Sequence, residues 1–551
     1  MVTTVIGAVI CFIPMLDPYT QPPSGQPVSC DVFVVGGGIN GAGIARDLAG
    51  RGCDVVLVEK DDLAQHTSSS STKLIHGGLR YLEFYEFGLV RKALKEREVL
   101  LRSAPHIMRP LRFVMPHNPS MRPAWMIRVG LFIYDHLARR EILPGSTGID
   151  LRRHEAGPPL KPEFVRGFAY SDGWVDDARL VLLNAIDARE RGAKIFTRRR
   201  CIEARRGASG WMLRTLGADG RELLFQARAL VNAAGPWAEG FLRQTAVPAG
   251  NEQLTRRSLR LVKGSHIVVP KLFDHACAYL FQNPDQRIIF AIPYEERFTL
   301  IGTTDVEIAE LPEAARITAD EVDYLCAQAS RYFRQSITPQ DVVWSYAGIR
   351  PLLDDRASAA LAVTRDYQLE ADSAAAPLLT VWGGKITTYR KLAEEAADAV
   401  LHELHENRPG WTRGAFLPGG ELIQGVAKGR RPDEDFRDFL EAQRQCYPWL
   451  EARHLERLAH AYGSRIARVM HGAARRAQLG AEVAPGLFEA ELHYLLEQEW
   501  AKSAEDILWR RSKLGLHFSA EEIAAVRAWV ARQLGGAEAV TRVPNEAAIG
   551  S

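Results

Sequence analysis

The stretch that decides the fold is Asp31–Glu59, which reads DVFVVGGGINGAGIARDLAGRGCDVVLVE. An apolar run, a glycine cluster, a helix-like segment and a second apolar run follow one another, as in a dinucleotide-binding unit. Gly36 permits a tight turn, Gly38 lets the backbone approach a pyrophosphate, and Gly41 lets the helix lie close to the strand. Glu59 can accept hydrogen bonds from a ribose diol, which disfavours NADP and leaves NAD and FAD open.

Three further segments favour FAD. The run 67–81, TSSSSTKLIHGGLRY, offers small hydroxyl groups to a pyrophosphate and two glycines that let the chain pass close to a flavin ring. Residues 229–237 and 378–389 each read as an apolar strand followed by glycine, so both are expected to return to the nucleotide-binding sheet. The expected cofactor-binding residues are Gly36, Gly38, Asn40, Gly41, Glu59, Ser68, Ser69, Thr72, Lys73, His76, Gly77, Gly78, Ala234, Gly235, Gly384, Lys385 and Thr387.

The rest of the chain predicts an α/β protein with a discontinuous Rossmann-like FAD-binding domain. Apolar segments at 266–270, 287–294 and 298–305 indicate an antiparallel substrate-side sheet, and charged, Ala- and Leu-rich segments after residue 420 indicate a helical C-terminal domain. The expected divisions are an extension at 1–28, the FAD-binding domain at 29–110, 170–260 and 345–405, the substrate-binding domain at 111–169 and 261–344, the helical domain at 410–535 and a tail at 536–551.

Composition excludes several classes of function. The net charge of +2 is too balanced to indicate nucleic acid as a partner. The seven cysteines have neither CxxC spacing nor histidines at ligand spacing, so no metal site and no disulfide framework are expected, and a reducing compartment fits best. Residues 5–13 are too short an apolar run to span a bilayer, which needs about 20 residues. Asp176 is expected to cap a helix rather than to bind a metal.

Eight motifs in order resemble the FAD-dependent glycerol-3-phosphate dehydrogenases of the aerobic bacterial type, within the D-amino-acid-oxidase-like flavoproteins. They are GGGINGAG, SSTKLIHGGLRY, AWMIRVGLFIYDHL, SDGWVDDARLVL, KGSHIVVP, IGTTDVE, AGIRPL and GGKITTYRKLAE, and the resemblance covers residues 31–535. It implies oxidation of sn-glycerol 3-phosphate to dihydroxyacetone phosphate by hydride transfer to FAD, with electrons passed to membrane quinone. It also implies a cytoplasmic protein bound peripherally to the inner face of the membrane. The chain departs from the family over its first 30 residues and at Thr72, where the related pattern has Ser.

A phosphate dianion calls for cationic side chains, and Arg offers a planar fork of donors. The segments expected to converge on the flavin supply Arg80, Arg350 and Lys385 as substrate-binding residues. The resemblance adds Tyr81 and Thr304 as donors to substrate oxygens, with a structural role as the alternative for each.

Oxidation of the substrate C2 requires a base for the hydroxyl proton. His266, at the start of an expected strand, has the right ordinary pKa, although a lone histidine is often structural. Lys385 or Arg350 can instead stabilise the alkoxide, so all three are candidate catalytic residues.

The electron acceptor stays open at this point. An oxidase using O2, an amine-oxidising relative and a flavin redox sensor without turnover are the alternatives to a quinone-linked dehydrogenase. The segment 122–134 mixes aromatic, aliphatic and basic residues, as interfacial helices do, and core packing is the alternative role for it. A homodimer is possible.

Overall fold

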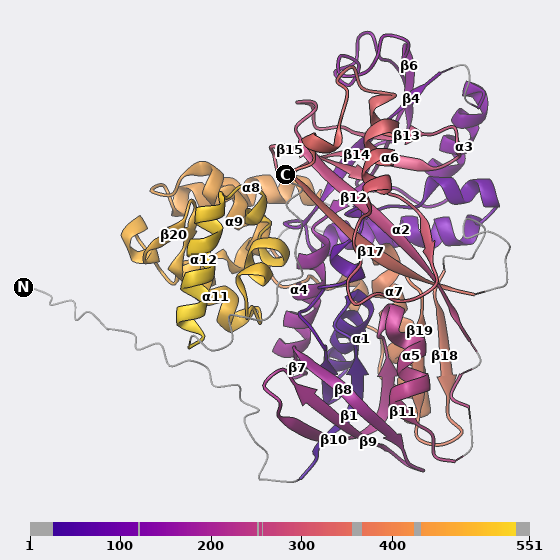
Figure 1. Cartoon of the computed structure of the whole chain (residues 1–551), viewed down its shortest axis with the longest axis vertical. Coiled ribbons are helices and arrows are strands. Elements are labelled where there is room, and N and C mark those ends of the chain that lie inside the picture. Colours follow the sequence, from indigo (N-terminus) through magenta and orange to yellow (C-terminus); the bar gives the residue numbers. More distant parts are fainter. Residues whose placement is uncertain are drawn as a thin grey trace, which may run out of the picture.

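The computed structural model describes residues 26–118, 122–250, 253–255, 257–354, 366–423 and 431–535. Most of the extension expected at 1–28 and all of the tail expected at 536–551 lie outside these residues. The body has two parts stacked along its long axis, and a small helical domain lies against one side (Figure 1).

The lower part is built on a nine-stranded sheet in the order β11-β8-β9-β10-β1-β2-β7, with β19 also pairing with β10, and β18 with β19. β1 pairs in parallel with β10 and β2, and β10 with β19, so the chain returns to this sheet as expected. The strands are β1 (Val28–Val35), β2 (Val55–Val58), β7 (Lys194–Phe196), β8 (Arg199–Arg206), β9 (Trp211–Gly217), β10 (Glu222–Asn232), β11 (Ala246–Val247), β18 (Gln368–Asp372) and β19 (Leu378–Trp382).

Helices cover one face of this sheet and form its main core. They are α1 (Ile39–Gly50), α4 (Asp177–Glu190) and α7 (Tyr389–Glu403). Gly43 lets α1 and α7 approach, because a Cβ there would lie 2.9 Å from the ring of Tyr389. Asp176 caps α4 as expected, accepting a hydrogen bond from the Arg179 N–H at 3.0 Å.

The upper part is built on a ten-stranded, mainly antiparallel sheet in the order β16-β12-β15-β14-β13-β4-β6-β3, with β17 pairing with β12 and β5 with β6. The expected hairpin is present, since β14 and β15 pair antiparallel on either side of residues 295–297. The strands are β3 (Leu74–Ile75), β4 (Met108–His117), β5 (Thr147–Asp150), β6 (Arg166–Val175), β12 (Leu259–Pro270), β13 (Ala278–Gln282), β14 (Ile288–Tyr294), β15 (Phe298–Gly302), β16 (Val306–Ile308) and β17 (Trp344–Leu353).

Two expected domain boundaries need correction. The FAD-binding segments were expected to begin at residues 170 and 345, but β6 and β17 are strands of the upper sheet. Both strands are long enough to run from the upper sheet toward the junction of the two parts, and pairing with β4 and β12 assigns them to that sheet. Three helices pack against the upper sheet. They are α2 (Phe87–Ser103), α3 (Ala124–His136) and α6 (Ala319–Ser330).

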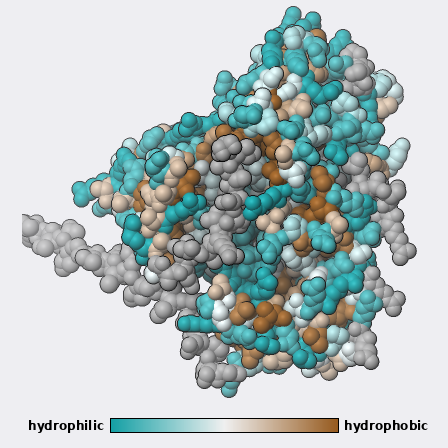
Figure 2. Space-filling model, in the orientation of Figure 1, coloured by the Kyte–Doolittle hydropathy of each residue, from teal (hydrophilic) through white to brown (hydrophobic). Residues whose placement is uncertain are grey.

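The C-terminal domain is helical, with one short hairpin and its own apolar core. Its elements are α8 (Pro432–Cys446), α9 (Ala452–Tyr462), α10 (Ile466–Met470), the hairpin β20 (Glu482–Ala484) and β21 (Leu487–Phe488), α11 (Glu489–Gln498) and α12 (Ala520–Gln533). A buried ion pair between Arg179 of α4 and Glu499, 2.6 Å apart, joins it to the body. In the view of Figure 2, hydrophilic residues dominate the outline and apolar ones lie in scattered patches near the centre.

Candidate active site

The glycine loop between β1 and α1 has the geometry expected for a dinucleotide. Gly36 has φ +110°, and a Cβ there would lie 2.5 Å from the carbonyl oxygen of Ala233. A Cβ on Gly41 would overlap the carbonyl of Gly36. Gly38 begins α1 without a side-chain cap of its own, which leaves backbone N–H groups and the positive end of the helix dipole at the turn. The loop therefore fits the close approach of a pyrophosphate.

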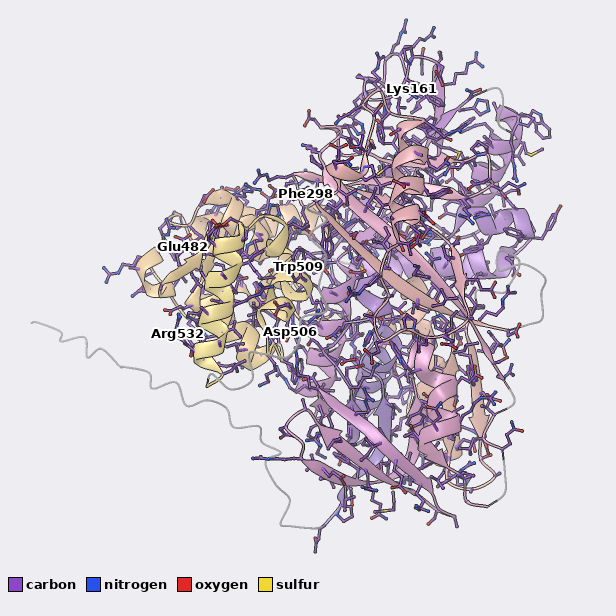
Figure 3. The ribbon with its side chains drawn as sticks, in the orientation of Figure 1. Lys161, Phe298, Glu482, Asp506, Trp509 and Arg532 are labelled. Atoms are coloured by element: carbon purple, nitrogen blue, oxygen red, sulfur yellow. The ribbon has the colours of Figure 1, made fainter. Side chains whose placement is uncertain are left out.

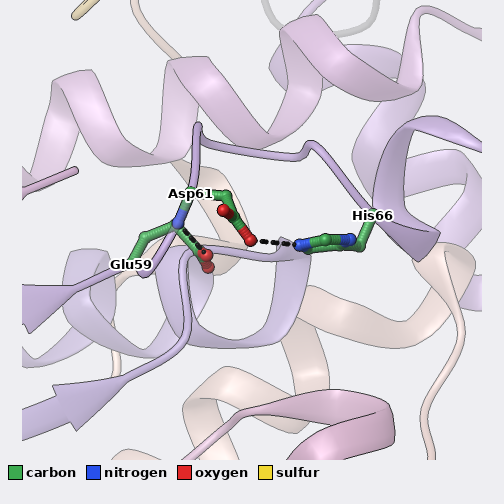
Figure 4. Close-up of side chains that lie close together, drawn as sticks. All are labelled: Glu59, Asp61 and His66. Carbon is green, nitrogen blue, oxygen red and sulfur yellow. Dashed lines mark hydrogen bonds and ion pairs between the residues drawn. The ribbon is translucent and has the colours of Figure 1, made fainter. Parts of the chain in front are cut away.

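Glu59 lies at the ribose end of this loop, buried beside Asp61 and His66 (Figure 4). Its carboxylate accepts the N–H of Gly37 at 2.6 Å and that of Asp61 at 2.9 Å, while His66 Nε2 lies 2.7 Å from Asp61 Oδ2. Burial raises the pKa of Glu59, and the two N–H groups oppose that shift. The ligand atoms of the three residues lie within 4.8 Å of one another, a spacing that would also suit a cation. Because backbone N–H groups engage both Glu59 oxygens, we assign the group to the dinucleotide rather than to a metal.

A cavity of about 780 Å³ extends from the start of α1 to the upper sheet. The expected site residues that line it are Ser68, Thr72, His76, Gly78, Arg80, Tyr81, Arg350, Gly384, Lys385 and Thr387. The expected site residues outside its lining are Gly36, Gly38, Asn40, Gly41, Glu59, Ser69, Lys73, Gly77, Ala234, Gly235, His266 and Thr304. Most of the second group belongs to the glycine loop or its immediate neighbours, and the cavity extends beyond that loop toward the upper sheet.

The hydroxyl-rich loop after Glu59 faces two ways. Ser68 Oγ accepts the N–H of Ile39 at 3.0 Å, so this hydroxyl reaches the first turn of α1. Lys73 turns away from the cavity: its Nζ lies 2.7 Å from Asp177 Oδ1, and both side chains are buried. Any contact of Lys73 with the cofactor would therefore come from its backbone, because the charge of its side chain is neutralised beneath the loop.

The segment after β19 closes the opposite side of the cavity. Gly383 and Gly384 have φ +70° and +106°, the left-handed region that glycine favours. Asn40 Nδ2 donates to the Gly383 carbonyl at 3.1 Å, which ties this turn to α1. Thr387 Oγ1 accepts the N–H of His76 at 3.2 Å, so the two flavin-side loops are bonded to each other.

Three cationic side chains from separate segments meet at the cavity. The Arg350 guanidinium pairs with Asp305 and donates to Thr303 Oγ1 at 3.0 Å, so its orientation is fixed. Lys385 Nζ lies 3.8 Å from the centre of the Tyr81 ring. Arg80 has no hydrogen bond or ion pair with any residue that the structure describes. The lining also contains Arg122 and the acidic residues Glu83, Asp305 and Asp366, so its cations outnumber its acids by one.

His266 lies directly behind this lining and is 1% exposed. Its Nε2 is 3.0 Å from the Thr72 hydroxyl, which does line the cavity, and its ring stacks on Tyr346 at 4.8 Å. Gly302, across the β12–β15 pair, makes room for the imidazole, because a Cβ there would lie 2.7 Å from its Cγ. Burial, the Arg350 charge and the Lys73 charge hold the pKa of His266 well below its ordinary value. The imidazole is therefore neutral near pH 7, with one ring nitrogen free to act as an acceptor, and the same burial and charges disfavour the protonated ring.

Thr304 does not reach the substrate side of the sheet, which corrects its expected role. Its hydroxyl donates to Glu321 Oε1 at 2.7 Å and accepts the N–H of Ser265 at 2.9 Å, and the side chain is buried. The neighbouring Thr303 and Asp305 line the cavity instead. Strand-like alternation over this segment would have separated them from Thr304, since successive side chains point to opposite faces.

One end of the cavity is surrounded by exposed apolar side chains. Phe84, Tyr85, Phe87, Met126 and Val129 line the cavity and are 39–80% exposed. Trp125 and Phe132, on the same helix α3, are 66% and 61% exposed. One side of α3 packs against the body, because Leu131 and Tyr134 are buried. The segment 122–134 therefore combines a packed side with an exposed one. Among the described residues, no helix combines the length and apolar character needed to cross a bilayer.

Comparisons with known proteins agree with this geometry. The model of the family described as FAD dependent oxidoreductase matches residues 31–390, and that described as C-terminal domain of alpha-glycerophosphate oxidase matches residues 410–539. A glycerol-3-phosphate dehydrogenase of Pseudomonas aeruginosa is 52% identical over 89% of this chain and 92% of its own length. A D-erythritol 1-phosphate dehydrogenase of Brucella abortus is 49% identical over 92% of this chain and 98% of its own length.

A solved structure shares the whole architecture. The glycerol-3-phosphate dehydrogenase from Bacillus halodurans, complexed with FAD, superposes with a TM-score of 0.73 at 30% identity, covering 93% of this chain and 92% of that one. The cofactor of that complex suits the glycine loop, the buried carboxylate and the two glycine-rich turns described above. The chain therefore belongs to the FAD-dependent oxidoreductase family, as a flavoenzyme built like the glycerol-3-phosphate dehydrogenases, with FAD as its cofactor.

Proposed function

We propose that the enzyme oxidises sn-glycerol 3-phosphate to dihydroxyacetone phosphate and passes the electrons to a membrane quinone. The observation that carries the proposal is the meeting of Arg80, Arg350 and Lys385 at one cavity beside the flavin loops. A monocarboxylate substrate would need one such cation, whereas a phosphate dianion makes use of several. The Pseudomonas aeruginosa relative, which carries the name of this activity, supports the same substrate.

Arg350 is the residue best prepared to hold the phosphate. Asp305 and Thr303 fix its guanidinium, so little side-chain entropy remains to be lost when a ligand binds. Arg80 and Lys385 approach from other loops and add positive charge. The substrate is thereby anchored by its phosphate, with the C2 hydroxyl free to turn toward the Thr72 wall.

FAD, when bound, supplies the hydride acceptor for the substrate C2. The protein supplies the base: the C2 hydroxyl donates to Thr72 Oγ1, and in the imidazole tautomer that carries its hydrogen on Nδ1 the Thr72 hydroxyl donates to His266 Nε2, 3.0 Å away. The proton passes to the imidazole while C2 becomes a carbonyl carbon, and it is released again readily because burial and the nearby cations disfavour the charged ring. The lowered pKa of His266 keeps this acceptor neutral at the pH of the cell.

The exposed apolar residues at the mouth of the cavity support peripheral docking on the inner face of the cytoplasmic membrane. Trp125, Met126, Val129 and Phe132 project from one helix, and the basic Arg128 of the same helix is exposed beside them. Such a surface inserts its apolar side chains shallowly while its cations meet anionic headgroups. A lipid-soluble quinone would then reach the cavity from the bilayer.

A second substrate is favoured by one observation. The Brucella abortus relative is named for D-erythritol 1-phosphate and is nearly as similar to this chain as the glycerol-3-phosphate dehydrogenase. Its substrate would use the same phosphate clamp and base, and it differs by one more hydroxymethylene group. The ratio of kcat/KM for the two alditol phosphates decides between them.

Reoxidation of the reduced enzyme tests the acceptor. The holoenzyme is reduced under nitrogen with one equivalent of glycerol 3-phosphate and then mixed in a stopped-flow instrument with a short-chain quinone or with O2. We expect rapid reoxidation by the quinone and slow reoxidation by O2. Fast reoxidation by O2 with stoichiometric peroxide would instead establish an oxidase.

A further inference from the structure

A column of aromatic rings runs from the C-terminal domain to the wall of the active site. Trp509 stacks on Trp344 with ring centres 5.0 Å apart and an interplanar angle of 19°. Trp344 contacts Tyr346 at 5.1 Å, and Tyr346 stacks on His266 at 4.8 Å. Figure 3 shows Trp509 on the side of the C-terminal domain that faces the body, whereas Glu482 and Arg532 lie on its far side. One residue of this domain is therefore three ring contacts from the proposed base.

The short helix that carries Trp509, η10 (Asp506–Arg511), is anchored to the other end of the site. Arg510 Nε donates to Asp62 Oδ2 at 2.6 Å, and Arg511 Nη2 donates to Asp62 Oδ1 at 2.8 Å. Asp62 is fully buried and lies three residues after Glu59. Burial would raise the pKa of Asp62, but the charges of Arg511 and Arg510 outweigh it and lower that pKa, so the carboxylate stays ionised. Trp509 is thus held in place by buried ion pairs with the nucleotide-binding part.

The middle of the column depends on packing. The Trp344 Nε1 atom is buried and has no hydrogen-bond partner in the part of the chain that the structure describes. Trp509 itself lies against Gly515, where a Cβ would come within 2.6 Å of its ring. Tyr346 is held by its hydroxyl, which donates to the Ser71 carbonyl at 2.8 Å, and Lys73 Nζ lies 5.1 Å from the centre of its ring. Removing the Trp509 ring would leave Trp344 without its stacking partner and would loosen the packing behind Tyr346.

We propose that Trp509 is a positioning residue for the oxidation, which holds the His266 imidazole against Thr72 through Trp344 and Tyr346. This rests on the proposed function, because it takes His266 as the proton acceptor. It also gives the C-terminal domain a role in catalysis. The helix η10 binds Asp62, near the nucleotide loop, through Arg510 and Arg511, and it contacts the Trp344–Tyr346–His266 rings through Trp509. A displacement of reacting groups by about 1 Å can cost a hundredfold in rate, so a loosened ring is expected to be felt.

The test uses the full-length, FAD-loaded enzyme and the rate at which glycerol 3-phosphate reduces its flavin. Trp509→Leu should lower that rate about tenfold with the substrate Kd changed by less than about twofold, since the phosphate clamp is untouched. Trp509→Phe keeps a ring and should recover most of the rate. Trp529→Leu is the control, because Trp529 is a tryptophan of the same domain that is buried in that domain's own core, where it contacts Glu489 and His493, whereas Trp509 is half-buried and stacks on Trp344.

The pH profile separates positioning from loss of stability. In Trp509→Leu, water reaches the imidazole and the pKa of His266 rises toward its ordinary value of about 6.5, so the rate should fall as the pH is lowered through that region. The wild-type enzyme and Trp529→Leu should show no such inflection. A Trp509→Leu rate and profile equal to those of Trp529→Leu would overturn the proposal.

A double-mutant cycle ties the effect to the base. In a His266→Gln background, Trp509→Leu should have no further effect, and the same factor in both backgrounds would refute the coupling. If Trp509→Leu fails to fold, Trp344→Leu serves instead, because it removes the middle ring of the column from the body of the protein. It should lower the rate of flavin reduction about as much as Trp509→Leu, and an unchanged rate would refute the proposed role of the ring contacts. A wild-type rate in His266→Gln would refute His266 as the proton acceptor. A slow His266→Gln together with a wild-type rate in Trp509→Leu would leave the acceptor in place and refute only the positioning role of Trp509.

Discussion

Replacement of Arg350 gives the sharpest prediction about substrate binding. Its guanidinium lies on the cavity wall with Nη1 paired to Asp305 and Nη2 bonded to Thr303. If it also forms two charge-assisted hydrogen bonds to the phosphate, Arg350→Met removes about 3–6 kcal/mol of binding, or roughly 150- to 20,000-fold in kcat/KM. Arg350→Lys keeps the charge but loses the fork, and we expect a loss of roughly 10- to 150-fold.

Asp305 makes the prediction more specific. In Arg350→Met its carboxylate stays at the cavity wall without its partner and repels the phosphate, so the double variant Arg350→Met/Asp305→Asn should bind the substrate better than Arg350→Met. Arg260→Met is the control, since Arg260 lies on the neighbouring strand β12, pairs with Glu307 at 2.7 Å and does not line the cavity.

The assay is steady-state oxidation of glycerol 3-phosphate with a soluble quinone, on enzyme of measured FAD content. A loss of less than about fivefold in Arg350→Met, with full FAD content, would show that the phosphate binds elsewhere in the cavity. An equal loss in Arg260→Met would show that the effect comes from the sheet and not from the clamp.

Three further predictions concern the base, the cofactor and the membrane. His266→Gln should lower kcat by roughly a hundred- to ten-thousandfold with little change in KM, and a kcat within threefold of wild type would exclude the imidazole as acceptor. Gly41→Ala should yield protein without FAD, because the added Cβ overlaps the Gly36 carbonyl; a stoichiometric flavin spectrum would contradict this. Trp125→Ser/Phe132→Ser should abolish sedimentation with anionic vesicles while leaving flavin reduction unchanged, and undiminished binding would place the docking surface elsewhere.

Much of the fold could be predicted because the deciding signals are local. The Gly36–Gly41 loop and the hairpin at 295–297 each depend on residues close in sequence, and both are present. Most of β6 and β17 was assigned to the FAD-binding domain, because the sequence of an apolar strand does not show which strand it pairs with. Only the hydrogen-bonded pairing across the sheet decides to which part such a strand belongs.

The site residues divide in the same way. Arg350 lies in strand β17 and Lys385 follows strand β19, each within a recognisable motif, and the structure brings both to the cavity. The Lys73 side chain points away from the cavity because it pairs with Asp177, more than a hundred residues later in the chain. A contact between residues so far apart cannot be predicted from a local sequence pattern. Thr304 was named as a substrate-binding residue with a structural role as the alternative, and its buried hydrogen bonds to Glu321 and Ser265 favour the structural role. The link from Trp509 to His266 crosses three segments, so the sequence alone could not have indicated it.

Anaerobic reduction of the bound flavin tests the central claim most directly. The holoenzyme is mixed under nitrogen with sn-glycerol 3-phosphate, D-erythritol 1-phosphate, glycerol or a D-amino acid, and the loss of the oxidised flavin spectrum is followed. We predict fast and complete bleaching by glycerol 3-phosphate, none by glycerol or the amino acid, and release of one dihydroxyacetone phosphate per flavin. Absence of bleaching by glycerol 3-phosphate, or bleaching by the amino acid instead, would contradict the account.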